Sequence, residues 1–333
     1  MYYERARRLS RRCAGVSELV TFGEGVLRLN PPHGERLETT TELEAHAAGS
    51  APATAVAAHR LGADSTWISK LPDSPLGHRV ERGLRGHGIE TRVVWGDEGR
   101  QGTYYVEHAG EPRGVNVHYD LTNSAFTTVD ASEFDLDVVR AARGFYATGI
   151  TPAVSGVAGE TTANLLGVAR QSGTTVALDV NYRSKMWSAG QARETLEQLF
   201  PAVDVLLVTA RDARRVLGYE DEDPPSIAHL VAADYDFTTV VVTRGSRGAI
   251  AWHDSVVHDH EGYETDTVDH VGAGDAFSGA FVARRLKGDD IRDALDYAAA
   301  TAALKRTIPG DVATVSREEV EAVIEGETRL VDR

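Results

Sequence analysis

The sequence predicts an α/β protein with a mostly parallel central sheet, helices on both of its faces and a small β-sheet lid. Three observations support this fold class. From about residue 140, short apolar strands alternate with helix-patterned segments, as in sheets whose parallel strands are joined by helices. The first 120 residues instead hold β-rich pieces with few helices between them. The 333 residues are 42% hydrophobic, which is enough to bury a large core.

The first part of the chain predicts the start of the main sheet. Residues 19–23 begin a strand, and residues 26–29 continue it or form a second one before two prolines interrupt the pattern. An alanine-rich helix is expected at 53–61, where Gly62 provides a natural end, and a strand follows at 66–68.

A hairpin is predicted next. Two β-rich runs, 101–107 and 115–119, flank residues 108–114. We expect the lid to come from parts of about 25–48 and 100–120.

The second part of the chain predicts regular alternation. Strands are expected at 144–147, 175–179, 203–208, 239–243 and 250–252. Helices are expected near 160–171, 192–200, 210–217, 275–287 and 291–307.

Residues 19–330 are predicted to form a single domain, because no internal repeat or low-complexity linker divides them. Residues 1–18 differ from the rest, since they carry five arginines and no apolar run of the kind that a signal peptide needs. We expect a disordered basic extension there.

The net charge of −15 argues against nucleic acid or anionic membranes as partners. Only four of the 35 basic residues are lysines (Lys70, Lys185, Lys287 and Lys305). Many carboxylates with Arg in place of Lys indicate a protein that works in concentrated salt, although an ordinary acidic cytosolic enzyme is the alternative. The single Cys13 excludes an internal disulfide and fits a reducing cytoplasm. No apolar run approaches the length of a membrane span.

The most informative stretch runs from Asp269 to Phe281. It places small residues directly before a helix-patterned segment, with Asp275 at the junction. Unpaired backbone N–H groups and the dipole at a helix start bind anions such as phosphate, and glycines let the backbone approach closely. The same dipole should keep Asp275 ionised, as a base must be. The pattern therefore predicts phosphoryl transfer to an alcohol; the alternative is a tight Gly turn with Asp275 as helix N-cap.

This stretch resembles the D-T-x-G-A-G-D-x-F signature of ribokinase-like (PfkB-type) carbohydrate kinases. The resemblance implies that Asp275 is the catalytic base and that the backbone of Gly272, Ala273 and Gly274 stabilises the transferring phosphoryl group. It also implies ATP and Mg²⁺ as cofactors, with K⁺ as a further candidate. The chain departs from the signature at His270 and Val271.

A second polar group follows the strand at 175–179. Asp179, Asn181 and Arg183 alternate, so an extended chain would place them on one face, where the Arg183 fork suits a carboxylate or phosphate. The alternative is a structural salt bridge with Trp187 as a packing anchor. The stretch resembles D-x-N-x-R-x-x-L-W of the 2-keto-3-deoxygluconate kinase branch, which implies that Arg183 binds the carboxylate of a sugar acid.

Further motifs resemble the nucleotide side of the same family. Thr243, Gly245 and Gly248 match its T-x-G-x-x-G turn, although a plain hairpin turn is the alternative. Thr209 and Asp212 stand where the family has N-x-x-E, which implies that Asp212 organises Mg²⁺ through water, with an exposed helix start as the alternative.

Four positions concern the sugar and the adenine. The resemblance implies that Tyr104 on the hairpin touches the sugar. The family's G-G-x-x-x-N retains Gly49 but has Ala53 in place of Asn, which removes two amide hydrogen bonds to a polyol. Ala299 likewise replaces a family Asn near the adenine.

The resemblance implies a cytoplasmic, halophilic kinase that associates through its lid. The expected reaction is ATP-dependent phosphorylation of 2-keto-3-deoxygluconate to 2-keto-3-deoxy-6-phosphogluconate, as in a modified Entner-Doudoroff pathway. The alternatives are a fructose, ribose or 2-keto-3-deoxygalactonate kinase, or a weakened paralogue that binds a sugar acid or nucleotide as a regulator. Nothing in the sequence separates the C4 epimers.

The charge predicts a salt-dependent stability. The screening length grows from about 3 Å at 1 M salt to about 30 Å at 0.01 M, so repulsion between surface carboxylates rises as salt is removed. The free energy of unfolding of a typical protein, about 5–15 kcal/mol, leaves little reserve against that repulsion. We expect Tm to fall steeply when KCl is lowered from molar concentration to about a tenth of it. A Tm that stays level over this range contradicts the halophilic interpretation.

Overall fold

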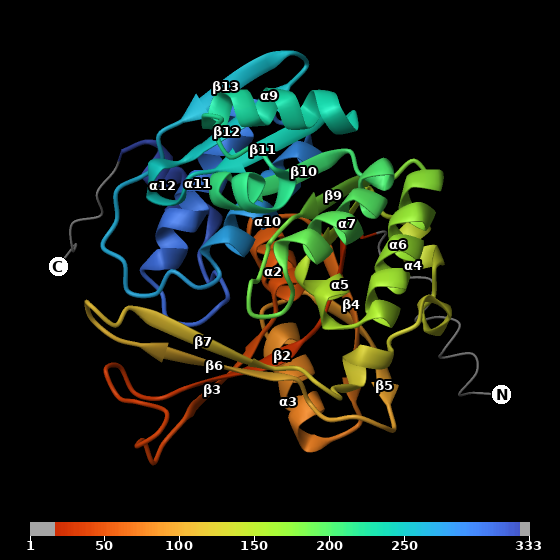
Figure 1. Ribbon diagram of the computed structural model, residues 1–333, viewed down its shortest axis with the longest axis vertical. Coiled ribbons are helices and arrows are strands. Elements are labelled where there is room, and N and C mark those ends of the chain that lie inside the picture. Colours follow the sequence, from red (N-terminus) through yellow and green to blue (C-terminus); the bar gives the residue numbers. More distant parts are fainter. Residues whose placement is uncertain (1–16, 327–333) are drawn as a thin grey trace.

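The computed structural model describes residues 17–326, so the extension predicted at 1–18 lies almost wholly outside the described residues. Its main element is a nine-stranded sheet (Figure 1). In sheet order the strands are β13 (Val256–His260), β12 (Ala249–His253), β11 (Thr239–Thr243), β10 (Val205–Thr209), β9 (Thr175–Asp179), β8 (Gly144–Thr148), β1 (Leu19–Phe22), β4 (Ser65–Pro72) and β5 (Glu90–Gly96). Only the pairings of β12 with β11 and β13 are antiparallel. The predicted fold class is confirmed.

The central strands are buried on both faces because their side chains alternate between two cores. In β1, Leu19 packs into one core and Val20 and Phe22 pack into the other. In β11, Val240 and Val242 face the same core as Val20, while the residue between them faces the opposite one. A period of two over short apolar runs is what a parallel sheet with two covered faces requires.

Helices cover both faces of this sheet (Figure 1). One face carries α2 (Ser50–Arg60), α10 (Ala273–Lys287), α11 (Ile291–Arg306) and α12 (Arg317–Ile324). The other carries α4 (Asp137–Ala141), α5 (Ile150–Val154), α6 (Gly156–Gln171), α7 (Ala189–Leu199), α9 (Pro224–Tyr235) and the short α8 (Ala210–Asp212), which continues into a π-helical turn at Ala213–Leu217. Short 3₁₀ turns lie at Ala125–Thr128, Ala131–Glu133, Phe200–Ala202 and Gly245–Arg247. None of the helices in residues 17–326 has the length and apolar character of a bilayer span.

A four-stranded second sheet forms the lid, in the order β3-β2-β6-β7. Its strands are β3 (Glu44–Ala48), β2 (Val26–Asn30), β6 (Thr103–His108) and β7 (Val115–Asp120). It lies below the main sheet in Figure 1 as a separate layer. The predicted hairpin is the antiparallel pair β6 and β7, and the lid strands fall within the predicted ranges.

The lid is joined to the main body by very short connections. Three residues, Gly23 to Gly25, separate β1 from β2. One residue, Gly49, separates β3 from α2, and its φ of 134° is closed to side chains with a Cβ. The lid strands are therefore held directly against the elements that carry the site.

The structure adds elements that the sequence patterns did not predict: α3 (Pro75–Arg85), β5, α4, α5, α9, β13 and α12. The helix predicted at 53–61 begins three residues earlier, at Ser50, because Pro52 lies in the first turn, where its missing N–H costs nothing. β5 is an edge strand with mostly half-buried or exposed residues, so it lacks the apolar run of an inner strand.

The order in which the chain adds strands to the sheet changes sides at β1. It first adds β4 and β5 on one side of β1 and later adds β8, β9, β10 and β11 on the other side. Loops that leave neighbouring strands in opposite directions open a crevice at their carboxyl ends, which is where open α/β sheets bind ligands.

Helices α2 and α10 pack closely at Gly279, and this contact generates a prediction. A Cβ at Gly279 would lie 2.3 Å from the backbone oxygen of Thr54. We expect Gly279→Ala to lower the free energy of unfolding by about 1–3 kcal/mol, because the added methyl group can be accommodated only if the backbone of α2 or α10 shifts. Urea unfolding at constant KCl measures this.

The matched control is Gly167→Ala in α6, where nothing lies within 4 Å of the added methyl. That variant should gain up to about 1 kcal/mol from helix propensity. Equal effects of the two substitutions would contradict a packing role for Gly279.

Candidate active site

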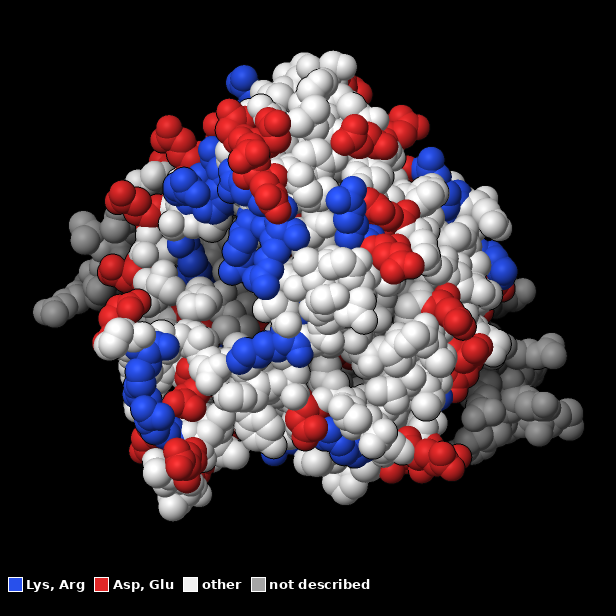
Figure 2. Space-filling view, in the orientation of Figure 1, with Lys and Arg blue, Asp and Glu red and all other residues white. Residues whose placement is uncertain are grey.

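A cavity of about 680 Å³ lies between the lid and the carboxyl ends of the parallel strands. Its wall includes lid residues, the residues after β1, β8 and β9, and the loop that begins α10. Figure 2 shows this face hollowed near its middle, with Lys and Arg side chains gathered around the hollow and Asp and Glu mostly toward the periphery. Arg183, Lys185 and Arg211 belong to the cavity wall. These three cations can bind anionic ligands, although the wall also holds carboxyl groups, namely those of Glu24, Asp179, Asp212, Asp275 and Asp311.

The start of α10 is built to hold an anion. Gly272 is its N-cap, with a φ of 81°, and a Cβ there would lie 2.0 Å from the backbone oxygen of Asp311. Within residues 17–326 the N–H groups of Gly274 and Asp275 have no hydrogen-bond partner, as expected for a first helical turn. Gly272 and Gly274 line the cavity, so these donors face it. The alternative in which Asp275 caps the helix is wrong, because Asp275 lies within the first turn and the cap has no side-chain hydrogen bond.

Asp275 is less acidic than the sequence suggests. Burial raises its pKa to about 7, and the neighbouring Asp179 carboxylate raises it as well, while Ser50 and Arg183 lower it. Burial thus opposes the effect expected from the helix dipole, so Asp275 is only partly ionised near pH 7. A carboxylate with a pKa near neutrality is well matched to general-base catalysis.

Ser50 is a site residue that the sequence patterns did not identify. It is the first residue of α2, and its hydroxyl donates to the Asp275 carboxylate. The same oxygen accepts a hydrogen bond from Asn181 Nδ2 at 2.8 Å. Ser50 thus joins the base to the loop after β9. Its sequence position could have indicated this role, because Ser50 directly follows Gly49 at the start of a helix that comes directly after a strand.

The loop after β9 brings Asp179, Asn181 and Arg183 to the cavity, although not by the predicted geometry. The chain is not extended here, because Asn181 has a φ of 41° and its N–H donates to Asp179 Oδ1 at 3.1 Å. This turn, rather than strand alternation, directs the three residues to one place. Burial raises the pKa of Asp179 to about 6.

Arg183 has no ion-pair partner in the described part of the chain; its Nη1 donates to the backbone oxygen of Tyr182 at 3.3 Å. The structural salt bridge considered as an alternative is therefore wrong. Trp187 does pack against the main core, as that alternative also required. A guanidinium at the cavity wall without a carboxylate partner can bind an anionic group of a ligand.

Asp212 lies deep in the wall. It is 1% exposed, so the alternative of an exposed helix start is wrong. Thr209 caps its helix by accepting from the Asp212 N–H at 2.9 Å. Oδ1 of Asp212 makes no hydrogen bond among residues 17–326, and its ion-pair contact is Arg211 Nε at 3.5 Å. A ligand or water could therefore still donate a hydrogen bond to this buried carboxylate.

A smaller cavity of about 110 Å³ continues from the first. Thr243, Gly245, Gly248 and Ala299 line it, and Gly274 and Thr243 belong to both cavities. A Cβ at Gly248 would lie 1.9 Å from the backbone oxygen of His260, so this turn admits only glycine. Thr243, Gly245, Gly248 and Ala299, which the sequence assigned to the nucleotide, thus meet at one place. This place lies next to the loop that begins α10 (residues 269–274), which we call the anion-binding loop.

Tyr104 reaches the cavity from β6, and its hydroxyl donates to Asp311. Asp311 also receives Arg28 Nη1 at 3.1 Å, while Arg28 Nη2 donates to Asp269 Oδ2 at 2.9 Å. Arg28 is 2% exposed and comes from the lid strand β2. No sequence pattern predicts this ion-pair network, because its members are far apart along the chain.

The two positions that correspond to the family's G-G-x-x-x-N motif, Gly49 and Ala53, differ in whether they reach the cavity. Gly49 lines the cavity, and a Cβ there would lie 2.3 Å from the backbone oxygen of Glu24. Ala53 is 1% exposed and is not part of the cavity wall. The polar group that α2 presents to the site is the Ser50 hydroxyl, one turn earlier.

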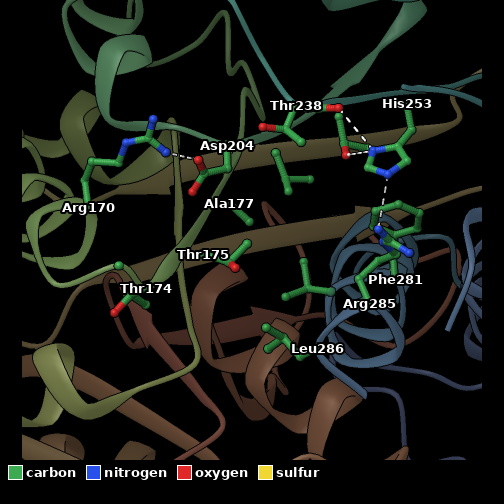
Figure 3. A pocket seen from close by; sticks show the side chains of 14 residues that line it. Arg170, Thr174, Thr175, Ala177, Asp204, Thr238, His253, Phe281, Arg285 and Leu286 are labelled. Carbon is green, nitrogen blue, oxygen red and sulfur yellow. Dashed lines mark hydrogen bonds and ion pairs between the residues drawn. The ribbon is translucent and has the colours of Figure 1, made fainter. Parts of the chain in front are cut away.

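A separate cavity of about 540 Å³ lies at the opposite, amino-terminal edge of the strands (Figure 3). Its wall contains the Arg170–Asp204 ion pair and His253, whose Nε2 lies 3.5 Å from Arg285 Nη2. Among the residues that line it, none belongs to the anion-binding loop. This cavity is therefore distinct from the site.

Residues 16–317 match the model of the pfkB family of carbohydrate kinases, which is most of the chain. The chain belongs to this family. It is 52% identical over 318 residues to 2-dehydro-3-deoxygalactonokinase of Haloferax volcanii, a match that covers 96% of this chain and 100% of that protein. It is 31% identical to 2-dehydro-3-deoxygluconokinase of Thermoproteus tenax, over 88% of this chain and 89% of that protein.

Solved structures of PfkB-type kinases agree with this assignment. The crystal structure of 2-dehydro-3-deoxygluconokinase from Thermotoga maritima superposes with a TM-score of 0.87 at 32% identity, covering 94% of this chain and 99% of that one. The predicted family and fold are confirmed, and the protein is a carbohydrate kinase.

The contact between Ser50 and Asp275 generates a prediction for this kinase. An ionised Asp275 is needed to accept a proton, so kcat/KM should fall as pH drops below about 7, where Asp275 becomes protonated. Ser50→Ala removes a hydrogen bond that lowers the pKa of Asp275, so this acidic limb should move to higher pH. The rate on the plateau should fall about tenfold, as one lost hydrogen bond implies.

Ser155→Ala is the control, because Ser155 caps α6 with its hydroxyl and belongs to neither cavity. It should lower Tm without moving the limb. If the acidic limb of the pH dependence of kcat/KM stays unchanged in Ser50→Ala, a group other than Asp275 is responsible for it.

Proposed function

We propose that this protein transfers the γ-phosphoryl group of ATP to the terminal hydroxyl of a 2-keto-3-deoxy sugar acid. The observation that carries the proposal is the unpaired Arg183 guanidinium in the wall of the larger cavity. A neutral sugar has no group that needs a cation at this position, whereas the carboxylate of a sugar acid does. The volume of about 680 Å³ suits a small ligand enclosed by protein.

The roles of the other residues follow from their positions. Asp275 accepts the hydroxyl proton as the oxygen attacks, and Ser50 and Asn181 orient its carboxylate. The N–H groups of Gly274 and Asp275 face the charge that develops on the transferred phosphoryl oxygens. Thr243, Gly245, Gly248 and Ala299 surround the nucleotide in the smaller cavity. Tyr104 and Gly49 contact the sugar.

The residues present fit a hydrated Mg²⁺ ion. In the described part of the chain no group of three or more His, Cys, Asp or Glu side chains could bind a metal directly. The buried Oδ1 of Asp212 accepts no hydrogen bond among the described residues and has only the contact with Arg211 Nε at 3.5 Å, so it suits the water shell of Mg²⁺, which usually keeps several waters and binds phosphates. When bound, the ion neutralises negative charge on the phosphates.

The choice between C4 epimers rests on the relatives. The relative that is 52% identical acts on 2-dehydro-3-deoxygalactonate by its name, while those that act on the gluconate epimer are 31% and 32% identical. We therefore place the galactonate epimer (2-keto-3-deoxygalactonate) first, ahead of the gluconate epimer that the sequence motif favours. Association through the lid and a cytoplasmic location remain predictions.

A substrate panel tests the proposal. ADP formation is measured in molar KCl with Mg²⁺ and ATP, using 2-keto-3-deoxygalactonate, 2-keto-3-deoxygluconate, fructose and ribose as acceptors. We expect the highest kcat/KM with the galactonate epimer and lower values with both neutral sugars. A neutral sugar as the best acceptor contradicts the proposal.

Arg183→Ala tests whether Arg183 binds the carboxylate of the sugar acid. Loss of a charged hydrogen bond costs about 1.5–3 kcal/mol, so KM for the sugar acid should rise about 10- to 100-fold while KM for ATP changes little. The control is Arg215→Ala, which removes an exposed arginine that lies over the ring of Tyr182 but does not itself line the cavity, so both KM values should change little. Equal effects of Arg183→Ala on both substrates would remove the assignment.

A further inference from the structure

Lys305 is a buried cation with no part in the reaction proposed above. It lies in the last turn of α11 and is 0% exposed. Its Nζ donates to the backbone oxygens of Asp269 at 3.2 Å and Ile308 at 2.9 Å. The carboxylates of Asp269 and Asp311 pair with Arg28 instead. Because burying an ammonium is costly, its position needs a structural or chemical reason.

The residue type is unusual for this chain. Only four of its 35 basic residues are lysines. Arg has a planar fork that needs more room and several acceptors, whereas the Lys ammonium is a compact point charge. Position 305 is therefore a fully buried site that holds the compact ammonium, whereas the buried Arg28 uses its fork to bind two carboxylates.

The ammonium holds together two segments of the site. Asp269 begins the loop that leads to Gly272, and Ile308 begins the segment that leads to Asp311. These segments also meet where the Gly310 N–H donates to Asp269 Oδ2 at 3.0 Å and where the Asp311 backbone oxygen packs against Gly272. Lys305 thus holds the start of the anion-binding loop, at Asp269, against the segment that begins at Ile308.

Backbone carbonyl oxygens around one positive charge are also how proteins hold K⁺. K⁺ is a candidate ion for this family resemblance, but the residues present do not fit a separate ion here. The Lys305 Nζ already takes the two oxygens that a cation beside Asp269 would need.

We propose that Lys305 is a tethered monovalent cation that positions the anion-binding loop, so that phosphoryl transfer in this protein does not require K⁺. The inference rests on the proposed function, because it assigns that loop to phosphoryl binding.

The first experiment uses the unmodified protein. Its kcat is measured at constant ionic strength in NaCl, in KCl and in mixtures of the two. The rate should be the same in all of them. A rate that requires K⁺ overturns the proposal.

The second experiment uses Lys305→Ala, which removes the ammonium and leaves space for a small ion. We expect kcat in NaCl to fall about 100-fold, because misplacement of a catalytic loop by about an ångström can have that effect. NH₄Cl or KCl should restore much of it, and Tm should be higher in these salts than in NaCl. Wild-type kcat in NaCl, or an equal loss in all three salts, overturns the proposal.

Two control variants separate this role from simple burial. Lys305→Met fills the space with an apolar chain, so it should lose activity without recovery in NH₄Cl. Lys70→Ala removes another largely buried ammonium, which binds Glu133 and the backbone oxygen of Thr128 away from both cavities. Its Tm should fall equally in all salts.

The Tm measurements need no sugar acid. If no acceptor in the panel is phosphorylated, the proposed function fails, while the salt-specific Tm of Lys305→Ala still decides the role of Lys305. If Lys305→Ala does not fold in any salt, the comparison of NaCl and KCl with the unmodified protein decides it.

Discussion

The site depends on one buried guanidinium. Arg28 of the lid strand β2 binds Asp269 at 2.9 Å and Asp311 at 3.1 Å, and all three residues are less than a tenth exposed. Asp269 begins the anion-binding loop, and Asp311 packs against its Gly272. One side chain therefore connects the lid to both segments that shape the loop. Removing it would leave two buried carboxylates with neutral hydrogen-bond donors but without this cation, which costs more than the ion pairs themselves contribute.

The second constraint is the crowding of carboxyl groups around the cavity. Burial raises the pKa of Asp275 and Glu24 to about 7 and that of Asp179 to about 6. Arg183 is the cation that lowers all three. A sugar acid that binds Arg183 takes up this compensating charge, so ligand binding and the protonation of the three carboxyl groups are coupled.

The sequence predicted what local pattern determines. The strand at 175–179, the strand at 239–243 and the Gly loop before α10 follow from apolar period and small-residue spacing, and the structure places them as expected. Contacts between distant segments left no such pattern: Arg28 and Asp311 are separated by 283 residues, and Ser50 and Asp275 by 225. The ionisation of Asp275 was misjudged for a related reason, since the dipole of its own helix is visible in sequence and its burial by other segments is not.

Gly49 has a mechanical consequence. It is the only residue between the lid strand β3 and helix α2, whose first residue, Ser50, contacts the base. No flexible segment intervenes to absorb a displacement. A tilt of the lid is therefore transmitted along the chain to the Ser50 oxygen, so the lid and the catalytic base cannot move independently.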